Sequence, residues 1–550
     1  MIYCYVNKKF IILFKRLFGK SFCIFSILYI LFIYLTYGML CYAFDEMSHW
    51  ATVVKTMTIY NKLSCFPNMN LMFQNYPPAM ALVQYFLQKI NSVIYGSNCF
   101  IDWHTYFIYD LFYISFAFPV IFKIKNKFLF IVSLLIIPFY FNSEYLYKTL
   151  LIDPFVGFVA AFGFIINFNY DHDDYYYYLY ECTLLFVLTL SKDVGLLFAI
   201  FISMYSLYIT FKSNKNKIIY AILIVISVLF AKLSWSLLLN INNSNIAFGS
   251  KIDLFQSLNI IFNNDNSYKT EVFHLYFNRL LCGETSFIIP LLRVSIPYSA
   301  FLLIILFLLF FLSSRMEKKE EFRIMNMVLC IEAIVYSLGL SLVYCFKFSE
   351  YEALILASFD RYLSMLIIQL VLILISYYFV IELKRTTKIL IKILIVIFCI
   401  YIFYGIDLKR VVKRDYITKS HNRRDCFTNI NLKVNDICDD NDKLFLVSEG
   451  DGGYNINAMN FLFKPIVVDN GIMPFNYNVN YFTGEKTNID ISPDELMNFL
   501  IENGYDYVLI FRTDDLFNEK YHSIFNEDSN IEDECLYSID ANEKKLIFVK

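Results

Sequence analysis

The chain has 550 residues, of which 58% are hydrophobic and 17% are charged. Soluble domains carry about a quarter charged residues, so this balance argues against an ordinary soluble protein and indicates that lipid is the solvent. The net charge is −2. Without a long run of Lys or Arg, it gives no support to nucleic-acid binding.

Apolar stretches long enough to cross a membrane recur along most of the chain. The first, at 21–40, follows five basic residues in 1–20. It is longer than the core of a signal peptide and has no convincing cleavage site, so we interpret it as a retained spanning helix. Ten further stretches complete a predicted set of about eleven spans. They are 104–122, 128–141, 154–169, 175–190, 194–211, 218–239, 294–312, 324–346, 363–381 and 389–405.

The charges between these stretches predict the orientation of the chain. With the N-terminus inside, the inner segments hold 18 Lys and Arg in 54 residues, and the outer loops between helices hold 11 in 144. The positive-inside rule therefore favours a cytoplasmic N-terminus, and an odd number of spans places the C-terminus outside. The two longest outer loops are 45–103 and 240–293, and long loops tend to carry function.

From about residue 406 onward the composition becomes polar. Short strand-like runs appear at 444–447, 465–468, 507–511 and 545–549. A helix is predicted over Pro493–Asn503, with Ser492 as its N-cap and the proline at its first position. We therefore predict a small soluble α/β domain on the outer side, covering 406–550.

The segment after the first helix concentrates ionisable side chains. Asp45 and Glu46 lie at the outer membrane edge, and in a helix His49 shares a face with both. A carboxylate half-shielded by lipid can have a raised pKa and attract a hydroxyl proton. Trp50 anchors such a segment at the interface. The alternative is that Asp45 caps a surface helix and Glu46 is an ordinary first-turn acid.

Four other features are expected on the same outer side. Tyr76 precedes two prolines that set a turn before a helix, and Asp153 opens the span 154–169. Lys192 interrupts a long apolar stretch, and Arg361 precedes a late span. Lysine and arginine suit a phosphate group. The ordinary explanations are a turn, an N-cap, a snorkelling lysine paired with its neighbouring acid, and a local ion pair or headgroup contact.

Together these residues resemble the GT-C membrane glycosyltransferases. The shared features are an Asp-Glu pair after the first helix, a later Tyr-Pro-Pro turn, an Asp opening the fourth helix, and a Lys between the fifth and sixth. The nearest branch contains protein O-mannosyltransferases and the aminoarabinose transferase of lipid A. The strings DEMSHW and SFDRY are similar to an uncharacterised bacterial branch. The resemblance covers about residues 20–400.

The resemblance implies a fold class and a location. The expected fold is a polytopic α-helical membrane protein of GT-C type with about eleven spanning helices and a small extracytoplasmic C-terminal α/β domain. Residues 1–405 are the expected transmembrane catalytic domain. The expected location is the bacterial plasma membrane.

The resemblance also implies the reaction and its acidic residues. The donor is a polyprenyl-phosphate-linked sugar, and the acceptor is a surface glycan, a wall polymer or a protein. Asp45 is the expected general base on the acceptor hydroxyl, Glu46 its support, and Asp153 a second acidic site. A single displacement inverts the anomeric carbon. No cofactor or metal is expected, although related oligosaccharyl transferases use a divalent metal.

Five residues are the expected substrate-binding set. Lys192 is expected to contact the donor phosphate, although the family's Thr-Lys-Gly turn is altered here, with its glycine displaced to Gly195. The other expected substrate-binding residues are His49, Trp50, Tyr76 and Arg361.

Three rival hypotheses remain open. A polymerase or ligase of lipid-linked glycans generally relies on loop arginines, which are few here. A transporter or flippase needs ionisable residues inside spans. Glu181 and Glu332 are expected to be the only acids there. A structural or sensing protein leaves the acids at 45–46 without a purpose.

Overall fold

The structure is a computed structural model, and it is mostly helical, with 72% helix. It describes residues 20–67, 69, 71, 73–96, 99–124, 127–141, 148–169, 175–213, 217–244, 252–262, 267–289, 294–315, 319–380, 413–470, 491–526 and 531–549. The predicted span 389–405 lies outside the described residues.

The chain divides into two compact units, each assembled from separated stretches of sequence. The helical unit comprises Met1–Tyr37, Asn75–Leu87 and His104–Arg414. The α/β unit comprises Gly38–Gln74, Gln88–Trp103 and Asp415–Lys550. The predicted division at residue 406 placed the whole loop 45–103 with the spanning helices. The contacts instead assign most of that loop to the C-terminal residues.

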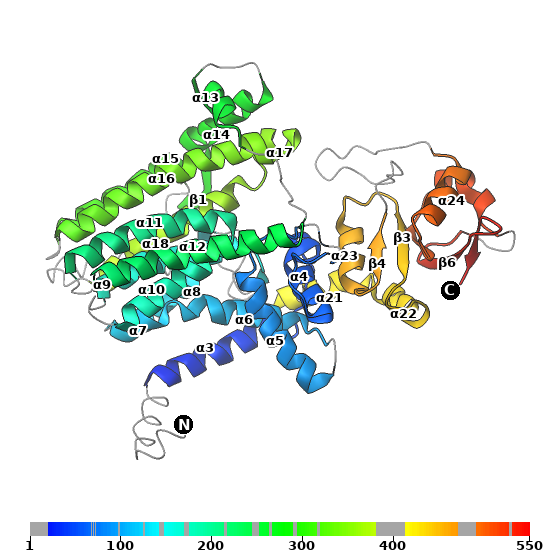
Figure 1. Ribbon diagram of the computed structural model, residues 1–550, viewed down its shortest axis with the longest axis horizontal. Helices are drawn as coiled ribbons and strands as arrows, with labels where there is room; N and C mark the ends of the chain where they lie inside the picture. Colours follow the sequence, from blue (N-terminus) through cyan, green and yellow to red (C-terminus); the bar gives the residue numbers. More distant parts are fainter. Residues whose placement is uncertain are drawn as a thin grey trace, which may run out of the picture. The chain divides into compact units, whose positions relative to one another are not determined.

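The helical unit is a set of mostly long, apolar helices (Figure 1). In chain order its helices are α3 (Lys20–Thr36), α7 (Phe118–Lys123), α8 (Lys127–Phe141), α9 (Asp153–Asn169), α10 (Tyr175–Thr189), α11 (Asp193–Ser213), α12 (Lys217–Ile241), α13 (Leu254–Phe262), α14 (Tyr268–Cys282), α15 (Tyr298–Ser313), α16 (Lys319–Lys347), α17 (Glu350–Leu354) and α18 (Phe359–Val380). Two further helices, α5 (Ala79–Tyr95) and α6 (Asp102–Ser115), have residues in both units.

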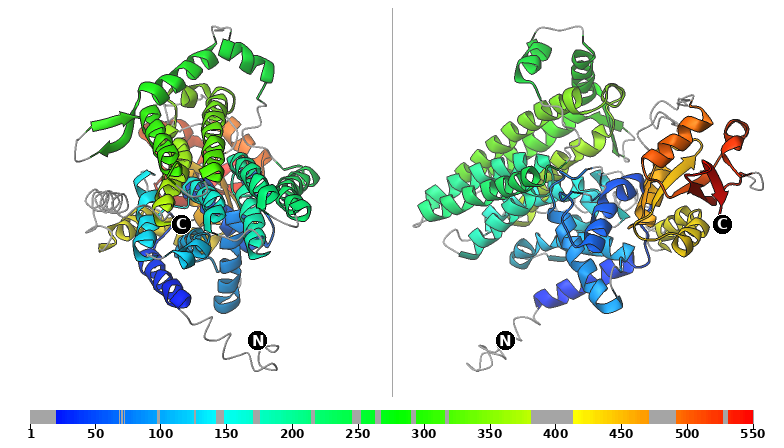
Figure 2. Two further views of the ribbon diagram at one scale, coloured as in Figure 1. Left: turned by 90° about the vertical axis from the view of Figure 1, so that its left-hand side faces the viewer. Right: turned by 45° about the vertical axis from the view of Figure 1, so that its right-hand side comes forward.

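Among the residues that the structure describes, four helices of the helical unit are long and apolar enough to cross a membrane. They span Asp193–Lys212, Ile218–Ile241, Glu320–Lys347 and Phe359–Tyr377. Shorter apolar helices cover Phe22–Thr36, Asp153–Asn167 and Tyr298–Ser313. Figures 1 and 2 show the long helices running side by side. These apolar helices are compatible with membrane insertion.

Two predicted spans differ from the helices that form. The span 104–122 is broken at Phe116-Ala117 into α6 and α7, and Pro119 lies in the first turn of α7, where proline starts a helix rather than continuing one. The span 294–312 begins only at Tyr298. Its first four residues form β2 (Val294–Pro297), which pairs antiparallel with β1 (Glu284–Ile289).

The α/β unit is built on a five-stranded sheet with strand order β4-β3-β5-β6-β7. Its strands are β3 (Lys443–Ser448), β4 (Val467–Asp469), β5 (Tyr507–Arg512), β6 (Cys535–Asp540) and β7 (Lys545–Phe548). The strand β3 pairs in parallel with β4 and β5, and the last two strands pair antiparallel. Its helices are α4 (Ala51–Tyr60), α21 (Asp415–Asp425), α22 (Thr428–Ile437), α23 (Tyr454–Leu462), α24 (Pro493–Glu502) and α25 (Asp515–Tyr521), with a π-helix η1 (Glu46–Trp50) and a 3₁₀ turn η3 (His522–Ile524).

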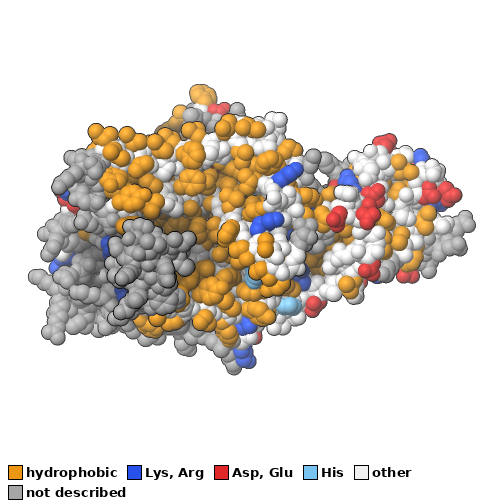
Figure 3. Space-filling view, turned by 60° about the horizontal axis from the view of Figure 1, so that its bottom comes forward, with side chains coloured by type: hydrophobic (Ala, Val, Ile, Leu, Met, Phe, Trp, Pro, Cys, Tyr) orange, Lys and Arg blue, Asp and Glu red, His pale blue; other side chains and the backbone are white. Residues whose placement is uncertain are grey.

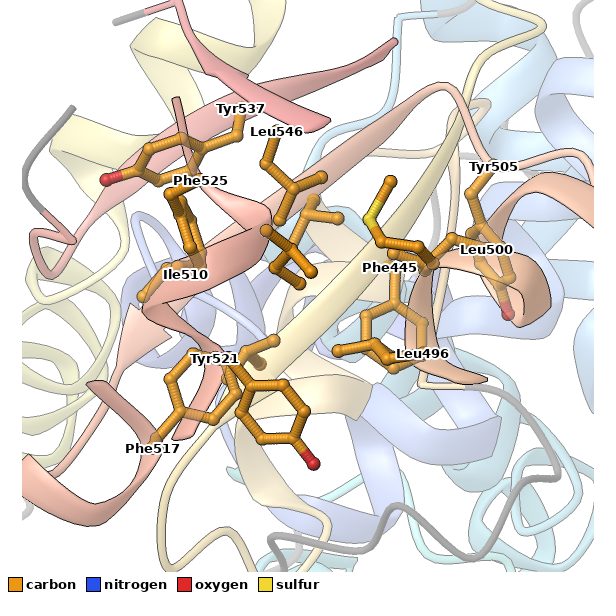
Figure 4. Packing of buried hydrophobic residues seen from close by; sticks show 14 of the residues in the cluster. Phe445, Leu496, Leu500, Tyr505, Ile510, Phe517, Tyr521, Phe525, Tyr537 and Leu546 are labelled. Carbon is orange, nitrogen blue, oxygen red and sulfur yellow. The ribbon is translucent and has the colours of Figure 1, made fainter. Parts of the chain in front are cut away.

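Helices cover both faces of this sheet. Alternate residues of β3, including Phe445, pack with Leu496 and Leu500 of α24 in the core that Figure 4 shows. On the other face Phe511 of β5 stacks on Phe427, which precedes α22, with ring centroids 5.6 Å apart. Because successive strand residues point to opposite faces, the near-continuous apolar strands are buried on both sides.

The predicted helix at Pro493–Asn503 is confirmed, and it ends one residue earlier. Ser492 caps it with a capping box, because its hydroxyl accepts from the amide of Glu495 and the Glu495 carboxylate accepts from the amide of Ser492. The four predicted strand runs correspond to β3, β4, β5 and β7, and β6 was not predicted.

The two units present different surfaces. On the face that Figure 3 shows, hydrophobic side chains cover most of the described surface of the helical unit, and acidic side chains gather over the C-terminal residues. Helix α12 exposes Ile222, Leu229 and Leu233 among others. Large apolar side chains exposed along a whole helix face are typical of contact with lipid.

Candidate functional site

The strongest charged cluster of the helical unit surrounds Asp153. This carboxylate is 1% exposed, and its Oδ1 lies 2.6 Å from the Lys192 ammonium nitrogen. Its Oδ2 lies 3.8 Å from Nε of Arg361. Both cations are partly exposed, at 16% and 25%. The Asp153 carboxylate thus faces two cations.

Three helix ends meet to make this cluster. Asp153 is the first residue of α9, Lys192 lies in the turn between α10 and α11, and Arg361 is in the first turn of α18. Helices α9 and α18 approach very closely one turn further on, where a Cβ at Gly157 would lie 2.5 Å from the carbonyl oxygen of Met365. The glycine therefore allows the backbone contact that brings Asp153 opposite Arg361.

A second glycine shapes the turn that carries Lys192. A Cβ at Gly195 would lie 2.0 Å from the carbonyl oxygen of Leu188, which no side chain permits. The amide of Gly195 donates to the Lys192 carbonyl at 2.8 Å, closing the turn. The displaced glycine of the altered motif is thus needed for the tight turn between α10 and α11.

Tyr362 lines the same cluster. Its ring centroid is 4.9 Å from the Lys192 nitrogen and 5.0 Å from the Arg361 guanidinium carbon, and its hydroxyl accepts from Nη2 of Arg361 at 3.0 Å. The Tyr362 carbonyl in turn accepts from the Tyr336 hydroxyl of α16 at 2.6 Å. The aromatic ring faces both cations, an arrangement that favours positive charge.

Asp360 belongs to a neighbouring ion pair rather than to the Asp153 cluster. Its Oδ1 accepts from the Tyr298 hydroxyl and lies 3.6 Å from Nη2 of Arg279. Sequence reasoning noted the string that contains Asp360 and Tyr362 but assigned neither a role, and it missed Arg279 and Tyr298. The position of Arg279 in the long loop 240–293, which the sequence predicts to be on the outer side, was the available signal.

The Tyr-Pro-Pro turn lies beside the Lys192 turn. The amide of Ala79, directly after the two prolines, donates to the carbonyl of Leu190 at 2.9 Å. The carbonyl of Asn75, directly before Tyr76, accepts from the Trp235 indole of α12 at 3.2 Å. Tyr76 itself is half-buried. Backbone hydrogen bonds thus place this turn next to the residues that carry Lys192.

The acidic pair at 45–46 lies in the α/β unit, where Glu46 is a structural anchor. Glu46 is 1% exposed, and its Oε2 accepts from the amides of Tyr42 and Ala43, each at 3.1 Å. A carboxylate that binds two backbone amides holds the turn before it. Glu46 therefore positions the backbone that leads into η1.

Asp45 is different from its neighbour. It is half-buried and helical in conformation (φ −64°, ψ −26°), and its side chain makes no capping hydrogen bond to η1. Asp45 therefore occupies the N-cap position of η1, with Glu46 in the first turn as the alternative predicts, but it does not act as a side-chain cap.

His49 is buried among aromatic rings. It is 5% exposed, and its ring lies edge-on to Trp50 at 4.6 Å and to Phe73 at 5.3 Å. Burial lowers the pKa of His49 from 6.5 to about 3, because the enclosed ring cannot hydrate the charged form. His49 is therefore neutral at physiological pH and cannot offer a positive charge to a phosphate.

No family model and no curated protein matches this chain. The roles of the two groups of residues therefore rest on their geometry. The structure brings Asp153, Lys192 and Arg361 together in the helical unit, with the Tyr76 turn beside them. Asp45, Glu46, His49 and Trp50 lie in the α/β unit.

Three acids are buried inside helices of the helical unit. Glu181 of α10 accepts from the Ser206 hydroxyl at 2.5 Å, and Glu332 of α16 accepts from the Gln369 amide at 3.1 and 3.2 Å. A third acid is buried as deeply as Glu181 and Glu332. Asp110 of α6 is fully buried, and within the part of the chain that is described neither of its oxygens has a hydrogen-bond partner.

Metal ligation has no visible support in the described ranges. No group of three or more His, Cys, Asp or Glu residues there is arranged to hold a metal ion. The cation pair at Asp153 is the feature of the helical unit that is best suited to an anionic ligand.

Proposed function

We propose that this chain is an integral membrane glycosyltransferase of GT-C type that transfers a sugar from a polyprenyl-phosphate donor to an extracytoplasmic acceptor. The observation that carries the proposal is the pairing of Lys192 and Arg361 on the buried Asp153. One cation from the turn between α10 and α11 and one from the first turn of α18 are held at one carboxylate, at the ends of helices whose apolar surfaces suit lipid.

The charge of this cluster matches the proposed donor. A polyprenyl-phosphate sugar is a phosphodiester with one negative charge, and Lys192 and Arg361 both bring positive charge to the cluster. When the bond from the sugar to the phosphate breaks, the leaving phosphate gains negative charge. Lys192 and Arg361 stabilise that charge, and fixed cations in a partly dry site do so strongly. Asp153 keeps both cations in place.

Asp45 is the general base in this proposal. It takes the proton from the acceptor hydroxyl, the hydroxyl oxygen attacks the anomeric carbon, and polyprenyl phosphate leaves with inversion. Glu46 is held by two backbone amides, so its proposed role is to position the segment rather than to move a proton. His49, being neutral and buried, supports the fold of η1, and Trp50 stays a proposed substrate contact.

The topology is part of the same proposal. About eleven spans, a cytoplasmic N-terminus and extracytoplasmic C-terminal residues in a bacterial plasma membrane place the long loops on the outer side. The donor must then be lipid-borne, since nucleotide sugars are not expected there. The acceptor is a surface glycan, a wall polymer or a protein.

The test compares surface glycans of cells that lack the gene and carry one variant each at equal expression. Asp45→Asn is expected to reduce the added sugar by at least 100-fold, the usual effect of losing a general base. Arg361→Gln should also reduce it, whereas Lys232→Gln should not. Lys232 pairs with Asp193 beside the same turn, 3.3 Å apart and well exposed. A normal glycan profile with Asp45→Asn would refute the proposal.

A transporter or flippase is the second candidate function, and the buried acids favour it. Asp110, Glu181 and Glu332 are carboxyl groups inside apolar helices, where ionisable residues often form proton or ion pathways. Under this hypothesis Glu332→Gln abolishes the cellular function and Asp45→Asn leaves it intact. The transferase proposal predicts the opposite result, in which Asp45→Asn abolishes the cellular function and Glu332→Gln leaves it intact.

A further inference from the structure

The residues that connect the first helix to the acidic pair have no regular structure of their own. We call residues 38–43 the connecting segment. It lies between α3 and η1, and residues 39–42 belong to no helix, strand or turn. Buried backbone amides and carbonyls need partners. Here three of those partners are side chains 380 to 412 residues away in sequence.

Two side chains of α21, together with Asp102 of α6, bind this backbone. The Ser420 hydroxyl accepts from the amide of Leu40 at 3.2 Å. Arg424 donates to the carbonyl of Cys41 at 2.7 Å and also binds Oδ2 of Asp102 at 3.0 Å. The same Asp102 oxygen accepts from the amide of Cys41 at 3.0 Å. Arg424 and Asp102 thus hold both polar groups of one peptide residue.

Residues at the N-terminus of α23 also bind the chain near the connecting segment. The Tyr454 hydroxyl donates to the carbonyl of Tyr42 at 2.9 Å. A Cβ at Gly453, which has φ +92°, would lie 3.4 Å from the ring of Phe44. Asp451 already caps this helix by accepting from the amides of Asn455 and Ile456.

A residue of the loop 45–103 binds the C-terminal end of α23. Lys55 of α4 donates to the carbonyls of Phe461 and Leu462 at 2.7 and 2.8 Å, the last carbonyls of that helix. A lysine at a helix C-terminus satisfies groups that lack partners within the helix. The helix α23 is therefore bound at both ends by the loop that carries Asp45.

The position of these contacts in the sheet is informative. In open α/β sheets, ligands bind beyond the carboxyl ends of the strands where the strand order reverses. Here β3 lies between β4 and β5, so that place is at the carboxyl ends of β3 and β5, and the loop after β3 leads to Gly453. The chain's own residues 42–44 pack at this edge.

We propose that the C-terminal α/β residues act as a positioning element for the acidic pair, with Arg424 as the central positioning residue. By fixing the backbone of the connecting segment, Arg424, Ser420 and Tyr454 determine where Asp45 projects. This inference rests on the proposed function only for the consequence that sugar transfer depends on Arg424. The physical claim about the connecting segment stands apart from it.

Hydrogen–deuterium exchange on the full chain in detergent tests the physical claim. Arg424→Gln is expected to accelerate exchange of the amides in residues 38–46 about tenfold, while peptides of α9 and α18 stay unchanged. The matched control is Arg423→Gln, the adjacent exposed arginine, which should change nothing in that segment. Equal exchange in Arg424→Gln and Arg423→Gln overturns the proposal.

Two further variants keep the test decisive if Arg424→Gln fails to fold. Arg424→Lys retains a donor for Cys41 and a charge for Asp102, so it should restore most of the protection. Tyr454→Phe removes one hydroxyl and should accelerate exchange in the same peptide two- to threefold. No acceleration with Tyr454→Phe and no protection with Arg424→Lys would also overturn the claim.

Surface glycans measured on the same variants test the link to function. Loss of the sugar with Arg424→Gln and its recovery with Arg424→Lys support positioning. Accelerated exchange with an unchanged glycan refutes the functional link alone. A normal glycan with Asp45→Asn refutes the proposed function, and the exchange result is then judged by itself.

Discussion

The two groups of charged residues in this chain are held in opposite ways. Around Asp153, ionic side chains pair with one another at the ends of well-formed helices, and glycines set the helix spacing. Around Asp45, side chains from distant residues bind the backbone of an irregular segment. A site made at helix ends depends on helix packing, whereas a site on an irregular segment depends on individual hydrogen bonds. The two regions should therefore respond differently to mutation.

The largest effect is expected from breaking the ion pair of Asp153. In Lys192→Met the 1% exposed carboxylate keeps only Arg361, 3.8 Å away. Removing one partner of a buried pair costs about 3 kcal/mol or more of unfolding free energy. Thermal unfolding of the purified protein in detergent measures it. Lys232→Met, which breaks a well-exposed pair, should cost less than about 1 kcal/mol. Equal losses in both would show that Asp153 is not effectively buried.

The next effect is a pH dependence in the α/β unit. Burial, with the nearby positive charges of Arg424 and Lys464, lowers the pKa of Lys55 from 10.5 to about 8, while Asp102 opposes the shift. The unfolded chain then binds more protons between pH 8 and 10.5, so stability rises with pH across this window. The difference between the pKa values of Lys55 in the unfolded and folded chain corresponds to at most about 3 kcal/mol of unfolding free energy.

The measurement for Lys55 compares unfolding of wild type and Lys55→Gln between pH 7 and pH 10. The free energy of unfolding of wild type, relative to that of Lys55→Gln, should increase as the pH rises. The comparison is needed because burial also lowers the pKa of Lys464 to about 8. Parallel pH profiles would mean that the Lys55 amine is well hydrated.

A smaller effect is expected at the contact between α9 and α18. In Gly157→Ala the new Cβ meets the Met365 carbonyl at 2.5 Å, so the helices must separate. Overpacking of this kind costs about 1–3 kcal/mol. Gly339→Ala is the matched control, since nothing lies within 4 Å of its Cβ in α16. It should be neutral or stabilising by up to about 1 kcal/mol. Similar melting of the two variants would contradict the close helix contact.

The smallest effects are expected from removing one capping box in each of the two units. Ser492→Ala removes the N-cap of α24 and should destabilise the α/β unit by about 1 kcal/mol. Ser349→Ala removes the same motif from α17 in the helical unit. Hydrogen–deuterium exchange should show each loss only in its own unit. Spread of either effect to both units would mean that they unfold as one.

Local patterns predicted much of the fold and part of the candidate site. The run after Pro493 and four of the five strands of the sheet follow from apolar periodicity and capping residues, which act within a few positions. Asp153, Lys192 and Arg361 were identifiable because ionisable residues at the ends of apolar stretches are rare. Their convergence was an expectation from topology, and the short distances between them come from the packing of α9 against α18.

Other residues gave little or no signal along the chain. Asp110 lies within the predicted span 104–122, but only the fold shows that it is fully buried. Arg424 follows another arginine in a polar helix, so nothing local separates the residue that binds Cys41 from its exposed neighbour. Glu46 looked like a partner in catalysis, but its carboxylate binds backbone amides. Each of these roles depends on what folds against the residue.

By itself, the sequence determined a lipid-compatible helical protein with polar, sheet-forming C-terminal residues, because composition and periodicity reflect the solvent that each segment meets. Only the tertiary structure decided that loop 45–103 is largely bound to those C-terminal residues, and that Glu46 and His49 are enclosed. The reason is physical: hydrophobic patterning is a property of neighbouring residues, whereas a hydrogen bond between Arg424 and Cys41 requires two distant stretches to fold together.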